Sequence, residues 1–239
     1  MADLRLVAVV QARLGSERLP GKVLLPLGER SLVAHLIGSL QSVGGLDEVV
    51  LAVPRRDDAL VAAGLALGVE VIEGAERDVL ARYALATAQT QADAVVRVTA
   101  DCPLLDPDLV SLAVADYRRD PCDYLTLEGY PRGTGDVEVA SADAIWWAHR
   151  DAEDPFEREH VMPHLARRPE TFRCRTLSAP TPLHRPDLRV CVDEQEDLDL
   201  VRRLVTLAGP PPLPVERIVS ILDDHPELVA LNGRVKQRS

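Results

Sequence analysis

Short apolar runs alternate with amphipathic stretches along the first half of the chain. The unbroken run Val7 to Val10 is typical of a strand that is covered on both faces of its sheet. Strands alternating with helices indicate βαβ units and a mostly parallel, doubly wound α/β sheet. The pattern predicts strands at residues 6–10, 48–53, 69–72 and 94–99, helices at 32–40, 59–67 and 78–89, and a further helix after Asp106.

The alternation changes between residues 121 and 150. There "CDYLTLEGYPRGTGDVEVAS" predicts two strands joined by a Gly/Pro-rich loop that is placed to cover a site. The following helix carries Trp146 and Trp147, which we interpret as packing residues.

The last third of the chain resumes with a predicted helix at 154–167, strands at "FRCRTLS" and "LRVCVD", and a helix at 194–207. The run "GPPPLP" cannot be helical throughout, because successive prolines remove backbone donors and clash with the preceding turn. We therefore expect a main domain at 1–208, a Pro-rich connector at 209–214, and a C-terminal segment at 215–239 that packs on the same domain. A final helix is expected near residues 215–221.

The composition, with 46% hydrophobic and 27% charged residues among 239, is that of a soluble globular protein. A formal net charge of -11 argues against a broad surface for nucleic acid or for an anionic membrane. No run of about 18 apolar residues occurs and no signal peptide is evident, so the cytoplasm is the expected location. The widely spaced cysteines predict reduced, mostly buried thiols rather than a zinc site or a disulfide framework: Cys102, Cys122, Cys174 and Cys191.

The loop after the first strand gathers three cations, Arg13, Arg18 and Lys22. Ligands of open α/β sheets lie beyond the carboxyl ends of the strands, which is where this loop belongs. Gly15 and Gly21 let backbone N–H groups approach a ligand closely, while the cations converge on anionic oxygens. The loop therefore predicts a polyphosphate site, with a solvated turn as the alternative.

Two aspartates hold equivalent positions after apolar runs. Asp101 follows the strand at 94–99 and Asp193 ends "LRVCVD". Magnesium is usually held by one or two carboxylates together with phosphate oxygens and water. The pair therefore predicts a magnesium site facing the cationic loop, with helix capping by Asp193 as the alternative. In "DPD", we interpret Asp106 as a helix cap rather than as part of a D-x-D metal motif.

His160 and His164 are four residues apart on the helix predicted at 154–167 and could bind a metal together. No third ligand is apparent near them in the sequence. A surface pair or a pair that contacts substrate is the preferred interpretation.

Several segments together resemble one enzyme family. "VVQARLGSERLPGKVLLPLG", "VRVTADCPLLDPDLV", "YPRGTGDVEVAS", "DPFEREHVMPHL" and "VDEQEDLDLVRRL" resemble the cytidylyltransferase family that includes the CMP-sugar-acid synthetases, particularly its spore-coat polysaccharide branch. The resemblance implies a nucleotide-diphospho-sugar transferase, Rossmann-like fold: a mostly parallel central sheet flanked by helices, with an inserted antiparallel element. It also implies transfer of CMP from CTP to a sugar acid or similar small acceptor, Mg²⁺ as cofactor, and a homodimer.

The resemblance assigns roles by matching positions. Arg13, Lys22, Asp101 and Asp193 match catalytic positions, and the two aspartates match the magnesium ligands. The nucleotide-binding positions are Ala12, Arg13, Gly15, Ser16, Arg18, Lys22, Thr99 and Asp101, and the acceptor-facing positions are Arg132, Asp136, Glu138, Glu159 and His160.

The sequence departs from one branch of that family. "TADCP" stands where the ketodeoxyoctonate enzymes have Q-G-D-E-P, so their acceptor does not carry over. The choice of cytosine rests on the resemblance alone. The alternatives are a glycosyltransferase with a nucleotide-sugar donor, a nucleotidyltransferase with another base preference, and a nucleotide-binding regulatory protein.

Overall fold

A computed structural model describes residues 4–235 of the chain. The strands of its main sheet are β1 (Leu6–Gln11), β4 (Glu48–Pro54), β5 (Glu70–Gly74), β6 (Ala94–Thr99), β7 (Tyr124–Glu128), β8 (Glu138–Ser141) and β9 (Cys174–Ser178), and β2 (Pro26–Leu27) and β3 (Arg30–Ser31) pair separately. The helices are α1 (Leu32–Gln41), α2 (Asp58–Ala66), α3 (Val79–Thr90), α4 (Pro107–Arg119), α5 (Ala142–Asp151), α6 (Pro155–His160), α7 (Pro163–Ala166), α8 (Gln195–Ala208), α9 (Val215–Asp224) and α10 (Pro226–Asn232), with 3-10 turns η1 (Lys22–Leu24) and η2 (Thr181–Leu183).

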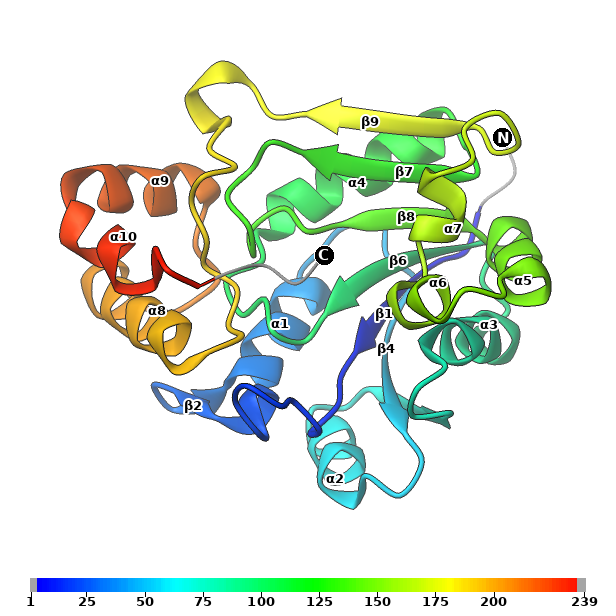
Figure 1. Ribbon diagram of the computed structural model, residues 1–239, viewed down its shortest axis with the longest axis horizontal. Coiled ribbons are helices and arrows are strands. Elements are labelled where there is room, and N and C mark those ends of the chain that lie inside the picture. Colours follow the sequence, from blue (N-terminus) through cyan, green and yellow to red (C-terminus); the bar gives the residue numbers. More distant parts are fainter. Residues whose placement is uncertain (1–3, 236–239) are drawn as a thin grey trace.

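The main sheet has the strand order β5-β4-β1-β6-β8-β7-β9 (Figure 1). Its strands are parallel except β8, which runs antiparallel to both β6 and β7. This arrangement confirms the mostly parallel sheet with an inserted antiparallel element. The carboxyl ends of β1, β4 and β6 lie at one edge, and the loops that follow them meet there.

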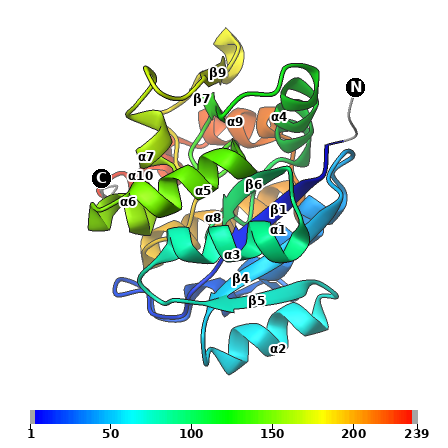
Figure 2. The ribbon, with the colours of Figure 1, turned by 90° about the vertical axis from the view of Figure 1, so that its right-hand side faces the viewer.

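Helices cover both faces of the sheet (Figure 2). Alternate side chains of β1 point to opposite faces. Val7 and Val9 pack in the cluster formed with α3, α5 and α7, whereas Ala8 and Val10 pack in the larger cluster formed with α1 and α4. All four are fully buried, which explains why this strand reads as a continuous apolar run.

The segment after the Pro-rich connector joins the larger cluster through residues of α9 such as Ile218. Asp106 connects this C-terminal segment to the start of α4. One of its carboxylate oxygens accepts a hydrogen bond from the backbone N–H of Asp108, and the other accepts one from the backbone N–H of Val215 at 2.8 Å. Asp106 therefore caps α4, with Pro107 in its first turn, and the cap interpretation of "DPD" is confirmed.

The predicted helix at 154–167 is wrong as one element. The chain breaks between α6 and α7 at Val161, whose φ is 71°. Pro163 lacks the backbone N–H that one continuous helix would need at this position, and it stands instead in the first turn of α7. His160 and His164 therefore lie on different helices. His164 Nδ1 lies 2.6 Å from Glu157 Oε2 in the interior, so the histidines do not form the pair that one helix would present.

Three smaller expectations also change. Residues 188–193 are not a sheet strand, since their backbone pairs with the loops at Asp101 and Arg132 and only Arg189 forms a bridge. Trp146 and Trp147 are 44% and 47% exposed, because the buried face of α5 is formed by other residues. The final helix runs on to residue 224 and is followed by α10.

The four cysteines are free thiols, as expected. Three are buried and Cys174 is partly buried. Within residues 4–235, no helix combines the length and the apolar character needed to cross a membrane.

Candidate active site

The loop between β1 and η1 folds back on itself above the carboxyl edge of the sheet. The backbone N–H groups of Ser16 and Gly21 both donate to Leu14 O. Gly21 has a φ of 68°, a left-handed conformation that glycine adopts without strain, and it leads directly into η1. Lys22 is thus placed at the start of η1 with its side chain directed back over the sheet edge.

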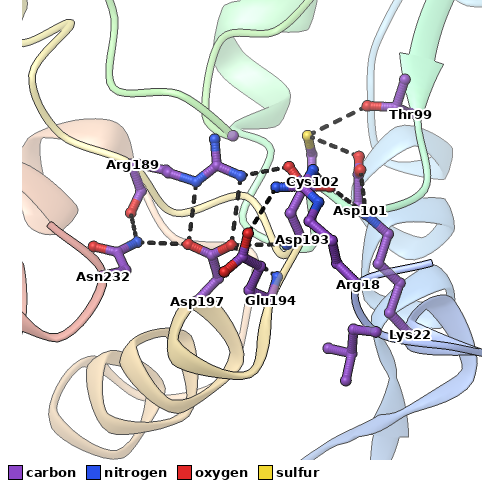
Figure 3. A network of polar contacts seen from close by, with 12 residues as sticks. Arg18, Lys22, Thr99, Asp101, Cys102, Arg189, Asp193, Glu194, Asp197 and Asn232 are labelled. Atoms are coloured by element: carbon purple, nitrogen blue, oxygen red, sulfur yellow. Dashed lines mark hydrogen bonds and ion pairs between the residues drawn. The ribbon is translucent and has the colours of Figure 1, made fainter. Parts of the chain in front are cut away.

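Lys22 joins the two predicted aspartates (Figure 3). Its Nζ lies 2.8 Å from Asp101 Oδ2 and 2.7 Å from Asp193 Oδ1. The Lys22 side chain is only 9% exposed. The structure therefore brings together a loop cation and two carboxylates that are separated by 79 and 171 residues in the chain.

Asp193 receives two further cations. Arg18 Nη2 lies 3.0 Å from Asp193 Oδ1, and Arg189 Nη2 donates to Asp193 Oδ2. Burial acts to raise the pKa of Asp193, but the charge of Lys22 and the hydrogen bonds from Lys22 and Arg189 outweigh it and lower the pKa to about 2. Burial acts to lower the pKa of Lys22, and the charges of Asp101 and Asp193 raise it instead. Lys22 and Asp193 are both charged at neutral pH.

A dependence of stability on pH follows from the Asp193 pKa. The pKa is about 2 in the folded protein against an ordinary value of 3.8, so Asp193 contributes about 2 kcal/mol of stability above pH 4, and this is lost as the pH falls toward 2. We expect Asp193→Asn to be less stable than the parent at pH 6 by about that amount, with the difference shrinking between pH 4 and 2.5. Urea unfolding at several pH values measures this difference. Asp58→Asn, at an exposed residue of α2, is the control, and a pH-independent deficit in Asp193→Asn would contradict the linkage.

The segment around Asp193 is held by Asp197, which is fully buried. Asp197 accepts from the backbone N–H groups of Asp193 at 2.9 Å and Glu194 at 3.0 Å, from Arg189 Nε at 3.1 Å, and from Asn232 Nδ2 at 2.8 Å (Figure 3). Glu194, not Asp193, is the N-cap of α8, so the capping alternative for Asp193 is wrong. Sequence reasoning missed Arg189, Asp197 and Asn232. Only Asp197 had a local signal, the three-residue spacing of a capping box after Glu194.

The chemistry of these donors fits a magnesium ion. Within the described chain, no group of three or more His, Cys, Asp or Glu residues gathers as a metal site. Magnesium needs fewer protein ligands, because phosphate oxygens and water fill the rest of its octahedron. Asp101 and Asp193 both contact the same nitrogen atom of Lys22, so one cationic group already bridges the two carboxylates.

Arg13 lies on the opposite side of the loop. Its Nη2 is 3.1 Å from Glu159 Oε1 on α6, and both side chains are 45% exposed. Arg13 and Gly15 also line a cavity of about 420 Å³ together with Arg55 and Arg56, which follow β4. Sequence reasoning missed Arg55 and Arg56, although two arginines after a buried strand were a visible signal. Asp57, Asp58 and Glu76 line the same cavity, so its charge is mixed.

The other nucleotide-loop residues have mostly structural contacts. Ala12 is buried and its N–H donates to Ala52 O at 3.2 Å, which joins the loop to β4. Ser16 Oγ accepts from the backbone N–H of Leu19. Thr99 Oγ1 lies 3.5 Å from Cys102 Sγ behind Asp101 (Figure 3).

A polar cluster lies beside this loop, on the face of the sheet that α3 and α6 cover. Arg97 of β6 pairs with Glu138 of β8, and Tyr124 Oη donates to Glu138 Oε1 at 2.6 Å. The buried Nε of Arg97 has no hydrogen-bond partner among the described residues. Burial, together with the charges of Arg97 and Arg13, lowers the pKa of His160 despite the opposing effect of Glu159. The structure thus brings Glu138, Glu159 and His160 into one neighbourhood, with Arg97 as a member that sequence reasoning missed.

The two remaining acceptor candidates lie elsewhere in the connecting loop between β7 and β8. Asp136 Oδ2 accepts from the backbone N–H of Gly133 at 2.6 Å and lies 3.8 Å from Cys102 Sγ, the neighbour of Asp101. Arg132 lines a separate cavity of about 160 Å³ together with Arg189 and Asn232.

Comparison with known proteins yields consistent matches. The family model described as cytidylyltransferase matches residues 7–218. An uncharacterised protein of Methanocaldococcus jannaschii is 32% identical over 238 residues, covering 99% of this chain and 98% of its own length. The spore coat polysaccharide biosynthesis protein SpsF of Bacillus subtilis is 29% identical over 228 residues, covering 92% of this chain and 94% of its own length. A solved cytidylyltransferase from Leptospira borgpetersenii superposes with a TM-score of 0.89 at 23% identity, covering 99% of both chains.

Proposed function

The chain belongs to the cytidylyltransferase family, and on that premise we propose that it transfers CMP from CTP to a sugar acid or similar small acceptor, with release of pyrophosphate. We further propose that Mg²⁺ is its cofactor. The observation that carries the proposal is the contact of Lys22 with both Asp101 and Asp193 at the carboxyl edge of the sheet. This contact places the loop proposed to bind phosphate directly beside the carboxylate pair.

The cations of the first loop would hold the triphosphate. Arg13, whose side chain is 45% exposed, would offer its guanidinium group to the phosphates, and Arg18 and Lys22 lie on the side of the carboxylate pair. As an acceptor oxygen attacks the α-phosphorus in line, these cations stabilise the negative charge that builds on departing pyrophosphate. Magnesium held by Asp101 and Asp193 would supply further positive charge beside the reacting phosphate. Catalysis of this kind depends on positioning and electrostatics.

The acceptor would enter from the side of α6, where Glu138, Glu159 and His160 gather. The lowered pKa of His160 keeps its imidazole neutral at pH 7, so the ring can accept the proton of an attacking hydroxyl. Asp136 is connected to Asp101 through Cys102, whose Sγ lies 3.7 Å from Asp101 Oδ1 and 3.8 Å from Asp136 Oδ2. The homodimer and the cytoplasmic location implied by the sequence stay predictions.

Calorimetric binding of CTP, UTP, GTP and ATP in the presence of magnesium tests the proposal. We expect CTP to bind at least about tenfold more tightly than the others, a difference of 1.4 kcal/mol, and Asp101→Asn to weaken that binding. Pyrophosphate release should then appear with a panel of sugar acids. Equal binding of all four nucleotides would instead favour another base preference, and binding of nucleotide-sugars alone would favour the glycosyltransferase alternative.

A further inference from the structure

The ammonium group of Lys22 lies between the two carboxylates proposed to hold magnesium. Both contacts, at 2.8 and 2.7 Å, are short enough to be charge-assisted hydrogen bonds. The side chain is almost entirely withdrawn from water, and Asp193 is only 14% exposed. In this state the chain supplies its own cation to the acidic pair.

The two carboxylates are already paired with cations of the chain. Lys22 contacts both of them. Arg18 and Arg189 contact Asp193, and they divide their charge between Asp193 and a second carboxylate, Glu194 for Arg18 and Asp197 for Arg189. A divalent ion approaching Asp101 and Asp193 therefore has to displace the ammonium group that bridges them.

Lys22 is also the member of this group best suited to move. Its charge stands on a flexible four-carbon stem, whereas Arg189 is fixed by Asp197 as well as by Asp193. Lys22 follows directly on the loop that is proposed to bind the triphosphate. A bound triphosphate would offer its ammonium group anionic oxygens outside the carboxylate pair.

We propose that Lys22 couples nucleotide binding to metal binding, by neutralising Asp101 and Asp193 in the free protein and transferring its ammonium group to the triphosphate when nucleotide binds. The two carboxylates then become available to a divalent cation only in the nucleotide complex. This inference rests on the proposed function, because it takes the two aspartates as the magnesium ligands. Thermodynamic linkage makes the coupling reciprocal, so the cation must strengthen nucleotide binding by the same factor.

Manganese binding, followed by the electron paramagnetic resonance of the free ion, tests the coupling without measuring turnover. For the parent protein we expect weak Mn²⁺ binding alone and binding about tenfold tighter with a non-hydrolysable α,β-methylene analogue of CTP, a factor typical of such coupling. For Lys22→Gln we expect Mn²⁺ alone to bind about tenfold more tightly than to the parent. The further gain from the analogue should be smaller than in the parent, because only the phosphate oxygens and not the release of Lys22 then contribute to it.

Arg18→Gln is the matched control, because it removes one positive charge that contacts Asp193 and Glu194 and leaves the Lys22 bridge in place. We expect it to change Mn²⁺ binding about threefold or less, since the bridge remains.

The double variant Lys22→Gln/Asp101→Asn should lose the tighter Mn²⁺ binding of Lys22→Gln. Such a loss would show that the bound ion lies at Asp101. Circular dichroism checks folding. If Lys22→Gln does not fold, Lys22→Arg tests the inference. Its retained positive charge should keep Mn²⁺ alone weakly bound and coupled to the analogue, and loss of that coupling with the charge retained would contradict neutralisation by the side chain.

The outcomes separate this inference from the proposed function. Equal Mn²⁺ affinity of the parent with and without the analogue, or no difference between Lys22→Gln and Arg18→Gln, overturns the coupling role and leaves the metal site in place. Failure of Mn²⁺ to bind the parent even with the analogue overturns the proposed metal site itself.

Discussion

Replacing Asp101 by Asn is expected to lower kcat roughly 10²- to 10³-fold, the loss typical of removing one preorganised electrostatic group from a reacting centre. The substitution keeps the shape of the side chain and removes its charge. The neutral side chain at position 101 no longer attracts the cation beside the reacting phosphate. It also no longer attracts Lys22, whose Nζ lies 2.8 Å from Asp101 Oδ2 in the parent. Pyrophosphate release at saturating CTP and acceptor measures the effect.

Asp108→Asn is the control for this experiment, because Asp108 is an exposed residue in the first turn of α4, a few residues further along the chain. Its turnover should stay at the parent level. Asp193→Asn should lose activity to a similar degree as Asp101→Asn, since both carboxylates contact the same nitrogen atom. If both aspartate variants kept full turnover, the assignment of these residues to the magnesium site would be wrong.

Periodicity predicted the fold well where local pattern and tertiary context agree. The run Val7 to Val10 predicted a strand buried on both faces, and β1 is one. The pattern failed at residues 188–193, whose alternating apolar side chains are also buried but whose backbone pairs with loops beyond the sheet edge. Burial alone does not tell a sheet strand from an extended segment that packs over one. It also failed at Val161, because the amphipathic spacing continues past Pro163, which lacks the backbone N–H that a continuous helix would need.

The sequence predicted those residues of the site whose neighbours along the chain mark them as functional. Asp101 and Asp193 each follow an apolar run, and the loop cations stand next to glycines, so each could be recognised from its neighbours in the sequence. Arg97 and Arg189 had no such signal. Their role in the site depends on ion pairs with Glu138 and Asp197, which lie beside them only in the folded chain.

The Arg97 and Glu138 pair leads to the second large expected effect. Glu138→Gln leaves the guanidinium of Arg97, whose side chain is 15% exposed, without its charged partner. Breaking such a pair costs about 3 kcal/mol of folding stability. We also expect kcat/KM for the acceptor to fall about 10²-fold while the affinity for CTP stays unchanged, because uncompensated charge here disturbs the acceptor side of the site. Urea unfolding, CTP calorimetry and pyrophosphate release at varied acceptor concentration give the three readouts.

The double variant Arg97→Gln/Glu138→Gln separates a structural role from a role in acceptor binding. Two amides at paired positions of β6 and β8 can hydrogen-bond to each other, and Tyr124 Oη can still donate to the amide at position 138. No unpaired charge remains, so most of the lost stability should return. If the acceptor contacts these charges, kcat/KM should stay low although stability recovers. Recovery of kcat/KM together with stability would show that the pair only supports the sheet, and recognition of the acceptor would then fall to the other acceptor candidates, Arg132, Asp136, Glu159 and His160.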